Sequence, residues 1–483
     1  MAVKSKNVGL EFSNTKKQQS RSLDTTKTKQ IAEEIKMRVN QKSNKADMVS
    51  IIPEQLSKEK LWSNPALLSA RSSALSSYRG YDKYNIMSPR IQSGELSIWQ
   101  CLPEELWLII LSSLTVNDLY SFMMTCRDFQ RISLDKSLWK TVTITKKQLA
   151  DAELEKLGQL QPTRLLIVQC SGTKLNGDIV TNRGMTSLFS AIGNNLKQLS
   201  VASCVQPPLS GEAMMHHAAL HCTNITDLNV SWCNLSDRDV TIIGDSFQHL
   251  HSLRLNGNQS LTDESVEVLY TRFQNQLKIL EIFGCFKIST NGLFMIGQCE
   301  RLGTLNIGQC YRLPAVAIQQ EVSRLPALTH LNMKGLKQLK DSCVTAIMKH
   351  CPRITSLNLS QCSGLTAKSL LEVSCALSDL DILDISSCPS AVTDASVCAL
   401  LANCRRLLSL DLSSTSVTNR TLNGIATTCT RLQELKLNFC SVSEVGVRAL
   451  VERVITLTNL QLYGVKGINN ETISTRTELS VEN

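Results

Sequence analysis

One phrase of nine residues, Ile354–Cys362 (ITSLNLSQC), constrains what this chain can fold into more than any other feature. The leucine at its centre, Leu357, is followed two positions later by a second leucine and five positions later by a cysteine. The central leucine recurs at Leu165, Leu199, Leu228, Leu253, Leu280, Leu305, Leu331, Leu383, Leu410, Leu435 and Leu460. From Leu199 to Leu460 the ten steps are each 25 to 29 residues long. A period this constant indicates a solenoid, in which each repeat packs only against its neighbours.

Each repeat is predicted to contain one short strand and one helix. Side chains alternate along a strand, so the central leucine and the residue two places later point into the core. A helix start signal follows, such as Leu261-Thr262-Asp263-Glu264, where a hydroxyl and acids satisfy free N–H groups of the first turn. The predicted fold class is α/β: a parallel leucine-rich-repeat solenoid, or horseshoe, of about 12 repeats over residues 145–465.

The cysteines follow the same period. Of the 18 cysteines, eight lie five residues after a central leucine: Cys170, Cys204, Cys233, Cys285, Cys310, Cys362, Cys388 and Cys440. Five more lie six residues before one: Cys222, Cys299, Cys351, Cys404 and Cys429. A thiol is small and tolerates burial, so it fits the corner where a strand leaves the core. Because Asn258 and Thr415 fill that corner elsewhere and no Cys-x-x-Cys pair occurs, we interpret these cysteines as architectural.

The basic charge of the chain is concentrated in residues 1–96, which contain 17 Lys and Arg against nine Asp and Glu. That segment accounts for +8 of the net charge of +9. Its polar, serine-rich composition predicts a disordered tail, because it cannot bury enough surface to offset the entropy of ordering. A near-neutral body argues against nucleic-acid binding by the repeats, which would then carry the positive charge themselves.

Apolar runs are short throughout the sequence. The longest, Leu106–Leu111, has six residues, far fewer than a membrane-spanning helix requires. The first residues, MAVKSKNVGL, lack the apolar core of a signal peptide. We therefore expect no membrane partner and a cytoplasmic and/or nuclear location, where thiols stay reduced.

Residues 97–144 predict a small all-α unit. Pro103 is well placed to begin a helix, and the two glutamates after it favour the positive end of the helix dipole. The next six residues, Leu106–Leu111, are apolar on every face. So short a unit cannot bury a helix of this kind alone. Part of its apolar surface must therefore contact neighbouring repeats or a protein partner.

The apolar positions of this unit resemble those of the F-box. They are Leu102-Pro103-Glu104-Glu105-Leu106, Ile110-Leu111, Leu114, Asp118-Leu119, Cys126, Phe129 and Leu138-Trp139. With the cysteine-bearing repeats that follow, residues 97–465 resemble an F-box/leucine-rich-repeat protein; residues 1–96 and the carboxy-terminal tail, 466–483, lie outside the resemblance.

This resemblance implies a non-catalytic substrate receptor of a Skp–cullin–F-box (cullin–RING) ubiquitin ligase. The F-box, residues 97–144, would dock on a Skp-family adaptor, and the repeats would bind a protein target for ubiquitination. The residues implied to contact the adaptor are Leu102, Pro103, Leu106, Ile110, Leu111 and Leu114.

Two alternatives stay open at this point. The apolar residues of the small unit could form the amino-terminal cap that a solenoid requires. Trp107 and Leu108 favour a partner instead, because they leave more apolar surface than a cap should show. The whole protein could also be a non-catalytic scaffold or structural subunit of a larger assembly, with the F-box serving only as a structural contact.

Target recognition is expected where outward residues of the strands break the pattern, which is mostly small or polar. Ile279, Glu281 and Phe283 form one unusual trio, and Phe283 has Asn256 and Gly308 as its counterparts in the adjacent repeats. Phe439 and Tyr463 form a second candidate patch towards the carboxy terminus. We predict that these five residues contact a protein target, since aromatic side chains anchor many interfaces. The alternative is that the aromatics only cover local sheet surface.

No pattern of catalytic or cofactor-binding residues stands out. His217 and His221 are four residues apart and could share a helix face, but a zinc protease needs a glutamate directly after the first histidine, and here Ala218 follows. Neither a phosphate-binding loop of the form G-x-x-x-x-G-K-[ST] nor a G-x-S-x-G nucleophile elbow occurs. We therefore expect no catalytic residue, no metal and no cofactor.

Overall fold

The computed structural model describes residues 102–114, 116–173, 179–468 and 480–482. The predicted disordered tail, 1–96, lies outside these residues, as does most of the predicted carboxy-terminal tail. The chain divides into two compact units, with the boundary between Leu138 and Trp139. The boundaries assigned from the sequence to the F-box and to the two tails remain predictions.

The first unit is built from three short α-helices, as its sequence predicts. They are α4 (Glu104–Leu111), α5 (Val116–Met123) and α6 (Arg127–Ser133), and a 3-10 turn, η4 (Lys136–Trp139), follows. Pro103 directly precedes α4, where its fixed φ of −56° suits a helix start. Three aromatic rings meet inside the unit: the Phe129 ring lies 4.2 Å from that of Phe122 and 5.0 Å from that of Trp107, centroid to centroid.

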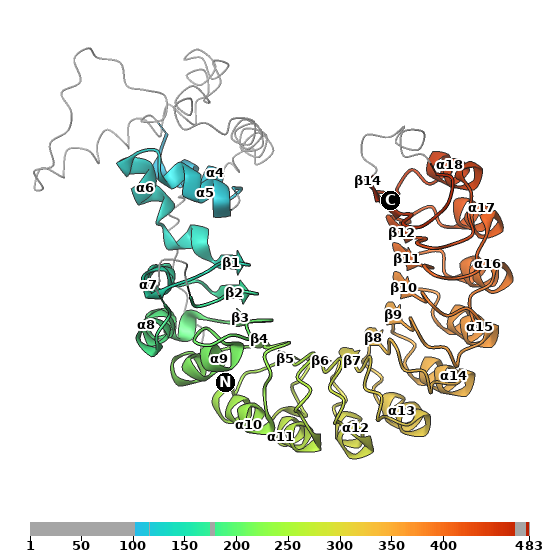
Figure 1. Ribbon diagram of the computed structural model, residues 1–483, viewed down its shortest axis with the longest axis horizontal. Helices are drawn as coiled ribbons and strands as arrows, with labels where there is room; N and C mark the ends of the chain where they lie inside the picture. Colours follow the sequence, from blue (N-terminus) through green and yellow to red (C-terminus); the bar gives the residue numbers. More distant parts are fainter. Residues whose placement is uncertain (1–101, 115, 174–178, 469–479, 483) are drawn as a thin grey trace, which may run out of the picture. The chain divides into compact units, whose positions relative to one another are not determined.

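The second unit is a solenoid with one continuous parallel sheet of 14 strands, ordered as in the sequence. Figure 1 shows the strands along the inner side of an arc and the helices along its outer side. The strands are β1 (Thr141–Thr145), β2 (Arg164–Val168), β3 (Gln198–Ser200), β4 (Asp227–Asn229), β5 (Ser252–Arg254), β6 (Ile279–Glu281), β7 (Thr304–Asn306), β8 (His330–Asn332), β9 (Ser356–Asn358), β10 (Ile382–Asp384), β11 (Ser409–Asp411), β12 (Glu434–Lys436), β13 (Asn459–Gln461) and β14 (Ser480–Glu482).

A helix connects each pair of successive strands from β1 to β13. The helices are α7 (Asp151–Gln159), α8 (Asn182–Ile192), α9 (Gly211–His221), α10 (Asp237–Ser246), α11 (Asp263–Phe273), α12 (Thr290–Ile296), α13 (Ala315–Val322), α14 (Asp341–His350), α15 (Ala367–Ala376), α16 (Asp394–Asn403), α17 (Asn419–Thr428) and α18 (Glu444–Arg453), with a 3-10 turn, η5 (Gly193–Asn195), after α8. Within the described ranges, no helix has the length and apolar character that crossing a bilayer would demand.

The leucine period forms the core, which confirms the predicted fold class. We number each repeat from its central leucine, which is position 0. Central leucines are direct partners in the sheet, as Leu331 and Leu357 or Leu357 and Leu383 show. All twelve central leucines and all twelve residues at position 2 are buried. The side chains of one helix face, for example Val397 and Leu400 in α16, close the core from the other side.

Two strands of the sheet lie outside the range predicted for the repeats. Strand β1 pairs with β2 through Val142, which stands opposite Leu165 in place of a central leucine. Strand β14 pairs with β13, so Val481 extends the leucine column beyond Leu460. The period did not predict either strand, because neither contains a central leucine. Pairing β14 on β13 covers backbone groups that a terminal strand would otherwise leave open.

The acids that begin the helices hold the outer layer together. In the sequence they were expected to favour their own helix dipole; in the structure they also reach the next helix. Asp237, the first residue of α10, accepts hydrogen bonds from the backbone N–H and hydroxyl of Thr262, which caps α11. The same pair of bonds joins Asp151 to Thr181, Asp263 to Ser289, Asp341 to Thr366, and Asp394 to Thr418. In these five places the start of a helix is thereby tied to the start of the preceding helix.

Truncating a central leucine should destabilise the solenoid locally. Leu357→Ala is expected to lower the free energy of unfolding by about 2–5 kcal/mol, because a fully buried side chain is removed. Leu371→Ala is the matched control, since Leu371 is exposed on α15 and its loss should cost no more than about 0.5 kcal/mol. Hydrogen exchange should quicken most in the repeats beside Leu357. Equal loss of protection in every repeat would contradict nearest-neighbour stacking.

The aspartates that accept hydrogen bonds from the cap of the next helix should make the stability of the solenoid depend on pH. Burial raises the pKa of Asp341, but the hydrogen bonds from Ser369 and Thr366 outweigh it, so its pKa lies below the ordinary value. The stabilisation is therefore complete above the unfolded-state pKa of about 3.9 and is lost as pH falls through the lower folded-state pKa. Asp341→Asn should flatten the acid limb of a stability–pH curve measured by denaturant unfolding.

Asp341→Asn should keep most of its stability at neutral pH, because the chain already uses an asparagine in this place. Asn419 begins α17, accepts a hydrogen bond from the Ser443 N–H at 3.0 Å and donates one to the Ser443 hydroxyl at 2.8 Å. If the stability of Asp341→Asn falls at acid pH as steeply as that of the wild type, Asp341 does not titrate as described.

Candidate functional site

The small helical unit exposes large apolar side chains although it has its own core. Trp107, Ile110 and Leu111 occupy one face of α4 and are buried. On other faces, Ile109 is 49% exposed and Met124, just after α5, is 64% exposed. Exposed apolar side chains of this size in so small a unit indicate a protein-binding surface.

The six residues expected to contact an adaptor separate into two groups. Leu102, Pro103, Leu106 and Leu114 are half-buried and so remain accessible. Ile110 and Leu111 are buried, and they can act only by supporting the others. Pro103, Leu106 and Ile109 lie three residues apart, which places them on one side of the helix start. Ile109 was missed because a run that is apolar on every face does not reveal which residues point outward.

On the inner face of the solenoid, the repeated asparagines at position 1 have a structural role. The Asn358 Oδ1 accepts a hydrogen bond from the Ser360 N–H at 2.9 Å, which closes the turn after the strand. Asn229, Asn306, Asn332, Asp384 and Asp411 make the corresponding bond in their own repeats. Asn or Asp at position 1 is therefore explained by the turn that it closes, whereas a different residue at this position needs another explanation.

The first candidate patch, Ile279, Glu281 and Phe283, lies in a repeat whose position 1 is Glu281 and not Asn or Asp. All three side chains are half-buried. Glu281 accepts hydrogen bonds from Arg254 Nε at 2.9 Å and Asn256 Nδ2 at 2.7 Å, so its charge is compensated. The Phe283 ring covers Gly308, where an added Cβ would lie only 2.7 Å from Cδ2 of the ring. The sequence correctly indicated room beside Phe283, and the ring fills part of it.

The second candidate patch, Phe439 and Tyr463, is more exposed. The two side chains are 58% and 62% exposed, and their rings meet edge to face with centroids 5.4 Å apart. Phe439 has a φ of +58°, a left-handed conformation that is costly for a bulky residue. Its ring lies over Gly464, whose added Cβ would come within 2.4 Å of Cδ1. The structure thus maintains two solvent-facing rings, and one of them, that of Phe439, is held in a backbone conformation that glycine would adopt more easily.

Position 4 is left-handed in every repeat, a feature that the sequence period did not reveal. Its occupants from β2 to β13 are Gln169, Ser203, Trp232, Gly257, Gly284, Gln309, Gly335, Gln361, Ser387, Ser414, Phe439 and Gly464. Most are small or flexible, as this conformation favours. Trp232 is an exception like Phe439: it is 45% exposed and its ring lies over Gly257. An aromatic residue followed one repeat later by glycine could have signalled both.

A further aromatic pair was also missed. Phe286 and Tyr311 occupy position 6 of adjacent repeats, and their rings stack with centroids 5.7 Å apart. Tyr311 is exposed, and a Cβ added at Gly284 would lie in ordinary contact with the Phe286 ring, 3.9 Å from its Cε1. With Trp232 and Phe283, these rings give the middle repeats an aromatic border where the strands end.

Comparison with known proteins agrees with both units. Residues 99–145 match the F-box-like family, and residues 221–241 and 248–269 match a Leucine Rich repeat family. Curated relatives carry the same combination in their names. The chain thus combines an F-box-like unit with leucine-rich repeats, the combination that these relatives' names state.

The relatives that match this chain are distant. It is 25% identical over 171 residues to putative F-box/LRR-repeat protein 9 of Arabidopsis thaliana, covering 34% of this chain and 68% of the relative. It is 24% identical over 270 residues to F-box/LRR-repeat protein 4 of Bos taurus, covering 54% of this chain and 42% of the relative. A chain in the crystal structure of the yeast Rad7 and Elc1 complex aligns with a TM-score of 0.51 at 19% identity, over 69% of this chain and 88% of that one, and so supports the fold alone.

The cysteines that follow the repeat are structural, as their spacing predicts. At position 5, the Cys362 thiol donates to the Met333 carbonyl of the preceding repeat at 3.2 Å, and Cys388 donates to Leu359 at the same distance. Asn258 replaces the thiol in one repeat and donates to the corresponding carbonyl, that of Val230, at 3.0 Å. Burial raises the pKa of Cys362 to about 12, so these thiols stay protonated and unreactive.

The histidine region contains a cluster that the sequence did not indicate. His216 on α9 lies 2.8 Å from Asp239 on α10, Nε2 to Oδ1. Glu212 lies beside them, and one possible metal-ligand atom from each of the three residues lies within 4.8 Å of the other two. The other Asp239 oxygen accepts hydrogen bonds from the Ser236 N–H and hydroxyl at the start of α10. The His216–Asp239 contact therefore clamps two neighbouring helices. Burial lowers the pKa of His217, aided by its histidine neighbours, so that ring is neutral near pH 7.

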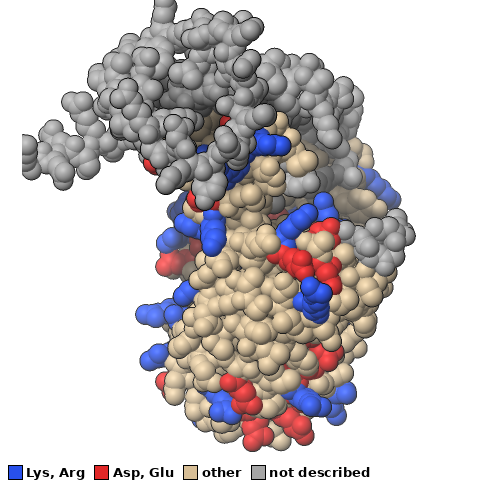
Figure 2. All heavy atoms as spheres, turned by 90° about the vertical axis from the view of Figure 1, so that its left-hand side faces the viewer, with Lys and Arg blue, Asp and Glu red and all other residues tan. Residues whose placement is uncertain are grey.

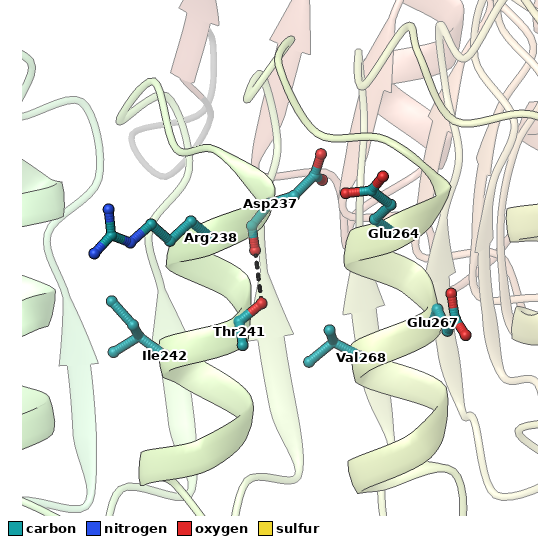
Figure 3. A pocket seen from close by; sticks show the side chains of 7 residues that line it. All are labelled: Asp237, Arg238, Thr241, Ile242, Glu264, Glu267 and Val268. Carbon is teal, nitrogen blue, oxygen red and sulfur yellow. Dashed lines mark hydrogen bonds between the residues drawn. The ribbon is translucent and has the colours of Figure 1, made fainter.

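The outer face carries an open depression of about 560 Å³ between α10 and α11. Figure 3 shows Arg238, Thr241 and Ile242 on one helix and Glu264, Glu267 and Val268 on the other. Asp237 lies at its upper end, but its carboxylate is already used by Thr262 and Ser265. The depression results from helix packing and brings no nucleophile and base together.

Thiol reactivity should follow burial. With Ellman's reagent, Cys126 and Cys375, the exposed cysteines among the described residues, should react rapidly in the native protein. The cysteines at position 5 should react only on unfolding, because their thiols are buried and protonated. Mass spectrometry of the labelled peptides would assign the sites. Rapid native labelling of Cys362 or Cys388 would contradict the architectural role.

Proposed function

We propose that this protein is the substrate-recognition subunit of a cullin–RING ubiquitin ligase of the Skp–cullin–F-box type. The observation that carries the proposal is the exposed apolar surface of the F-box unit, which includes Ile109 and Met124. A partner must cover such a surface, and a Skp-family adaptor is the partner that an F-box implies. The solenoid then holds a protein target by its inner face.

The proposed contribution to ubiquitination is proximity. Holding a target beside the ligase raises its effective concentration without any reactive group from this chain. The raised pKa of the buried thiols and the engagement of Asp237 and Asp239 in helix contacts support a non-catalytic role. We propose action in the cytoplasm and/or nucleus, with no cofactor.

A protein target is favoured over nucleic acid by the distribution of charge. On the side of the molecule drawn in Figure 2, the described basic and acidic side chains are interspersed among a larger uncharged surface. Some basic side chains of the solenoid also have acidic partners, as Arg254 and Arg406 show at 2.9 and 3.0 Å. A nucleic-acid-binding face needs clustered, uncompensated positive charge.

Adaptor binding tests the proposal directly. Ile109→Asp should reduce co-purification of a Skp-family adaptor at least about tenfold, because a charge would enter an apolar interface. The matched control is Leu371→Asp, which places the same charge at an exposed leucine of α15. Both variants should retain the wild-type Tm, since both side chains are exposed. Failure of the wild-type protein to bind the adaptor would overturn the proposal.

Target capture tests the second half of the proposal. Affinity purification with mass spectrometry should compare the full chain with a chain lacking residues 97–138, a deletion that leaves β1 in the solenoid sheet. Target proteins should be retained by both, whereas adaptor and cullin should be lost from the shortened chain. If retained proteins do not change in abundance when this protein is depleted, the scaffold alternative is favoured over the receptor.

A further inference from the structure

The carboxy-terminal half of the inner face carries negative charge that the fold does not require. Asp384 and Asp411 are register partners on β10 and β11. Each closes its own turn by accepting a hydrogen bond from a serine N–H, Ser386 at 3.1 Å and Ser413 at 2.9 Å. In other repeats Asn332 and Asn358 make the same bond at 2.9 Å with an uncharged amide. The two carboxylate charges therefore need another explanation.

Neither carboxylate forms an ion pair, since among the described residues no Lys or Arg nitrogen lies within 4.0 Å of either one. The second oxygen of Asp384 accepts a hydrogen bond from the uncharged Asn358 amide at 2.8 Å. Lys436 is the register partner of Asp411 and acts to lower its pKa, but its Nζ lies 3.3 Å from Oε1 of Glu434 in its own strand. Burial raises the pKa of Asp411, and the neighbouring charge of Asp384 adds to the effect. The ionised form of Asp411 is thus less favourable than that of a solvent-exposed carboxylate, and a cation from a ligand would stabilise it. In the first patch, by contrast, Arg254 already compensates Glu281.

The exposed ring pair lies on the following repeats of the same face. Phe439 follows β12 and Tyr463 follows β13, and their rings meet edge to face. The Tyr463 N–H donates to Asn438 Oδ1 at 2.8 Å and the Phe439 N–H to the Tyr463 carbonyl at 2.8 Å, so their backbones are held in place. From strand spacing and residue rise, the rings lie about 10–12 Å from Asp411, the reach of three or four extended residues.

Resting on the proposed receptor function, we propose that this surface binds an extended segment of the protein target with two recognition elements. A Lys or Arg side chain is placed against Asp384 and Asp411, and an apolar or aromatic side chain three or four residues away packs on Phe439 and Tyr463. Charge complementarity selects the first element, and exposed ring area selects the second.

The probes are Gly/Ser-based peptides in which one Arg stands at increasing distance from one Phe, with Glu in place of Arg as the control series. Binding to the full chain, measured by fluorescence polarisation, should be strongest at a separation of three or four residues and absent in the Glu series. Affinity that ignores the separation, or no binding in either series, would overturn the proposal.

Two variants test the elements separately, and the chain itself supplies tolerated replacements. Asp384→Asn with Asp411→Asn keeps the turn-closing bonds, as at Asn358. It also removes the Asp384 oxygen that accepts from the Asn358 amide, a change that position 1 already tolerates where Asn332 stands beside Asn358. The pair of substitutions should weaken the best peptide about tenfold or more. Serine is tolerated at this left-handed position, as Ser414 shows. Phe439→Ser should therefore remove the preference for peptides that contain Phe over peptides that have Gly in its place. The matched charge control is Asp245→Asn with Asp379→Asn, two exposed aspartates that pair with Arg272 and Arg406.

An equal loss of peptide affinity in the control would mean non-specific charge attraction and would overturn the proposed site. Adaptor co-purification should be unchanged in every variant, because the substitutions lie in the solenoid. If peptides bind as expected while the wild-type protein fails to bind an adaptor, the site stands and the receptor function falls. If the adaptor binds and no peptide does, the proposed site alone is wrong.

Discussion

The parallel pairing of one central leucine with the next is the interaction on which the rest of the structure depends. A single repeat has one strand of about three residues and one helix, too little to bury its own apolar residues. Leu357 is buried only because Leu331 and Leu383 stand on either side of it in the sheet. This register also sets the position of every other side chain, since a residue at a given position faces its equivalent one repeat away.

Three kinds of polar contact use that register and join adjacent repeats. On the outer side, Asp341 holds the start of the next helix through Thr366. At the corner, a thiol such as that of Cys362 donates to a carbonyl of the preceding repeat. On the inner side, in three repeats whose position 1 is not Asn or Asp, the preceding repeat closes the turn instead, as Asn256 does for the Phe283 N–H at 2.9 Å. Polar residues that the sequence alone would assign to a solvated surface therefore form hydrogen bonds with backbone groups that stacking would bury.

We propose that recognition is concentrated where these contacts are altered. Trp232 and Phe439 occupy a left-handed position that glycine, serine or glutamine fills elsewhere, and a glycine one repeat later leaves room for each ring. Strain and exposed ring area are both unfavourable in the free protein, which supports a role in binding. Asp384 and Asp411 depart from the pattern differently, because they keep the turn contact and add a charge. The solenoid thus combines a regular scaffold with a few substitutions at equivalent positions.

The sequence by itself determined the repeat, the parallel strands, the two buried positions of each strand, the corner role of the cysteines and the F-box unit, because each depends on spacing within about 30 residues. Only the tertiary structure decided which repeated residues contact the next repeat. It showed that Asp237 reaches Thr262, that Arg254 compensates Glu281, that Ile110 is buried while Ile109 is exposed, and that β1 and β14 extend the sheet. The reason is physical: periodicity gives the direction of each side chain, whereas its partner depends on how successive repeats stack in space.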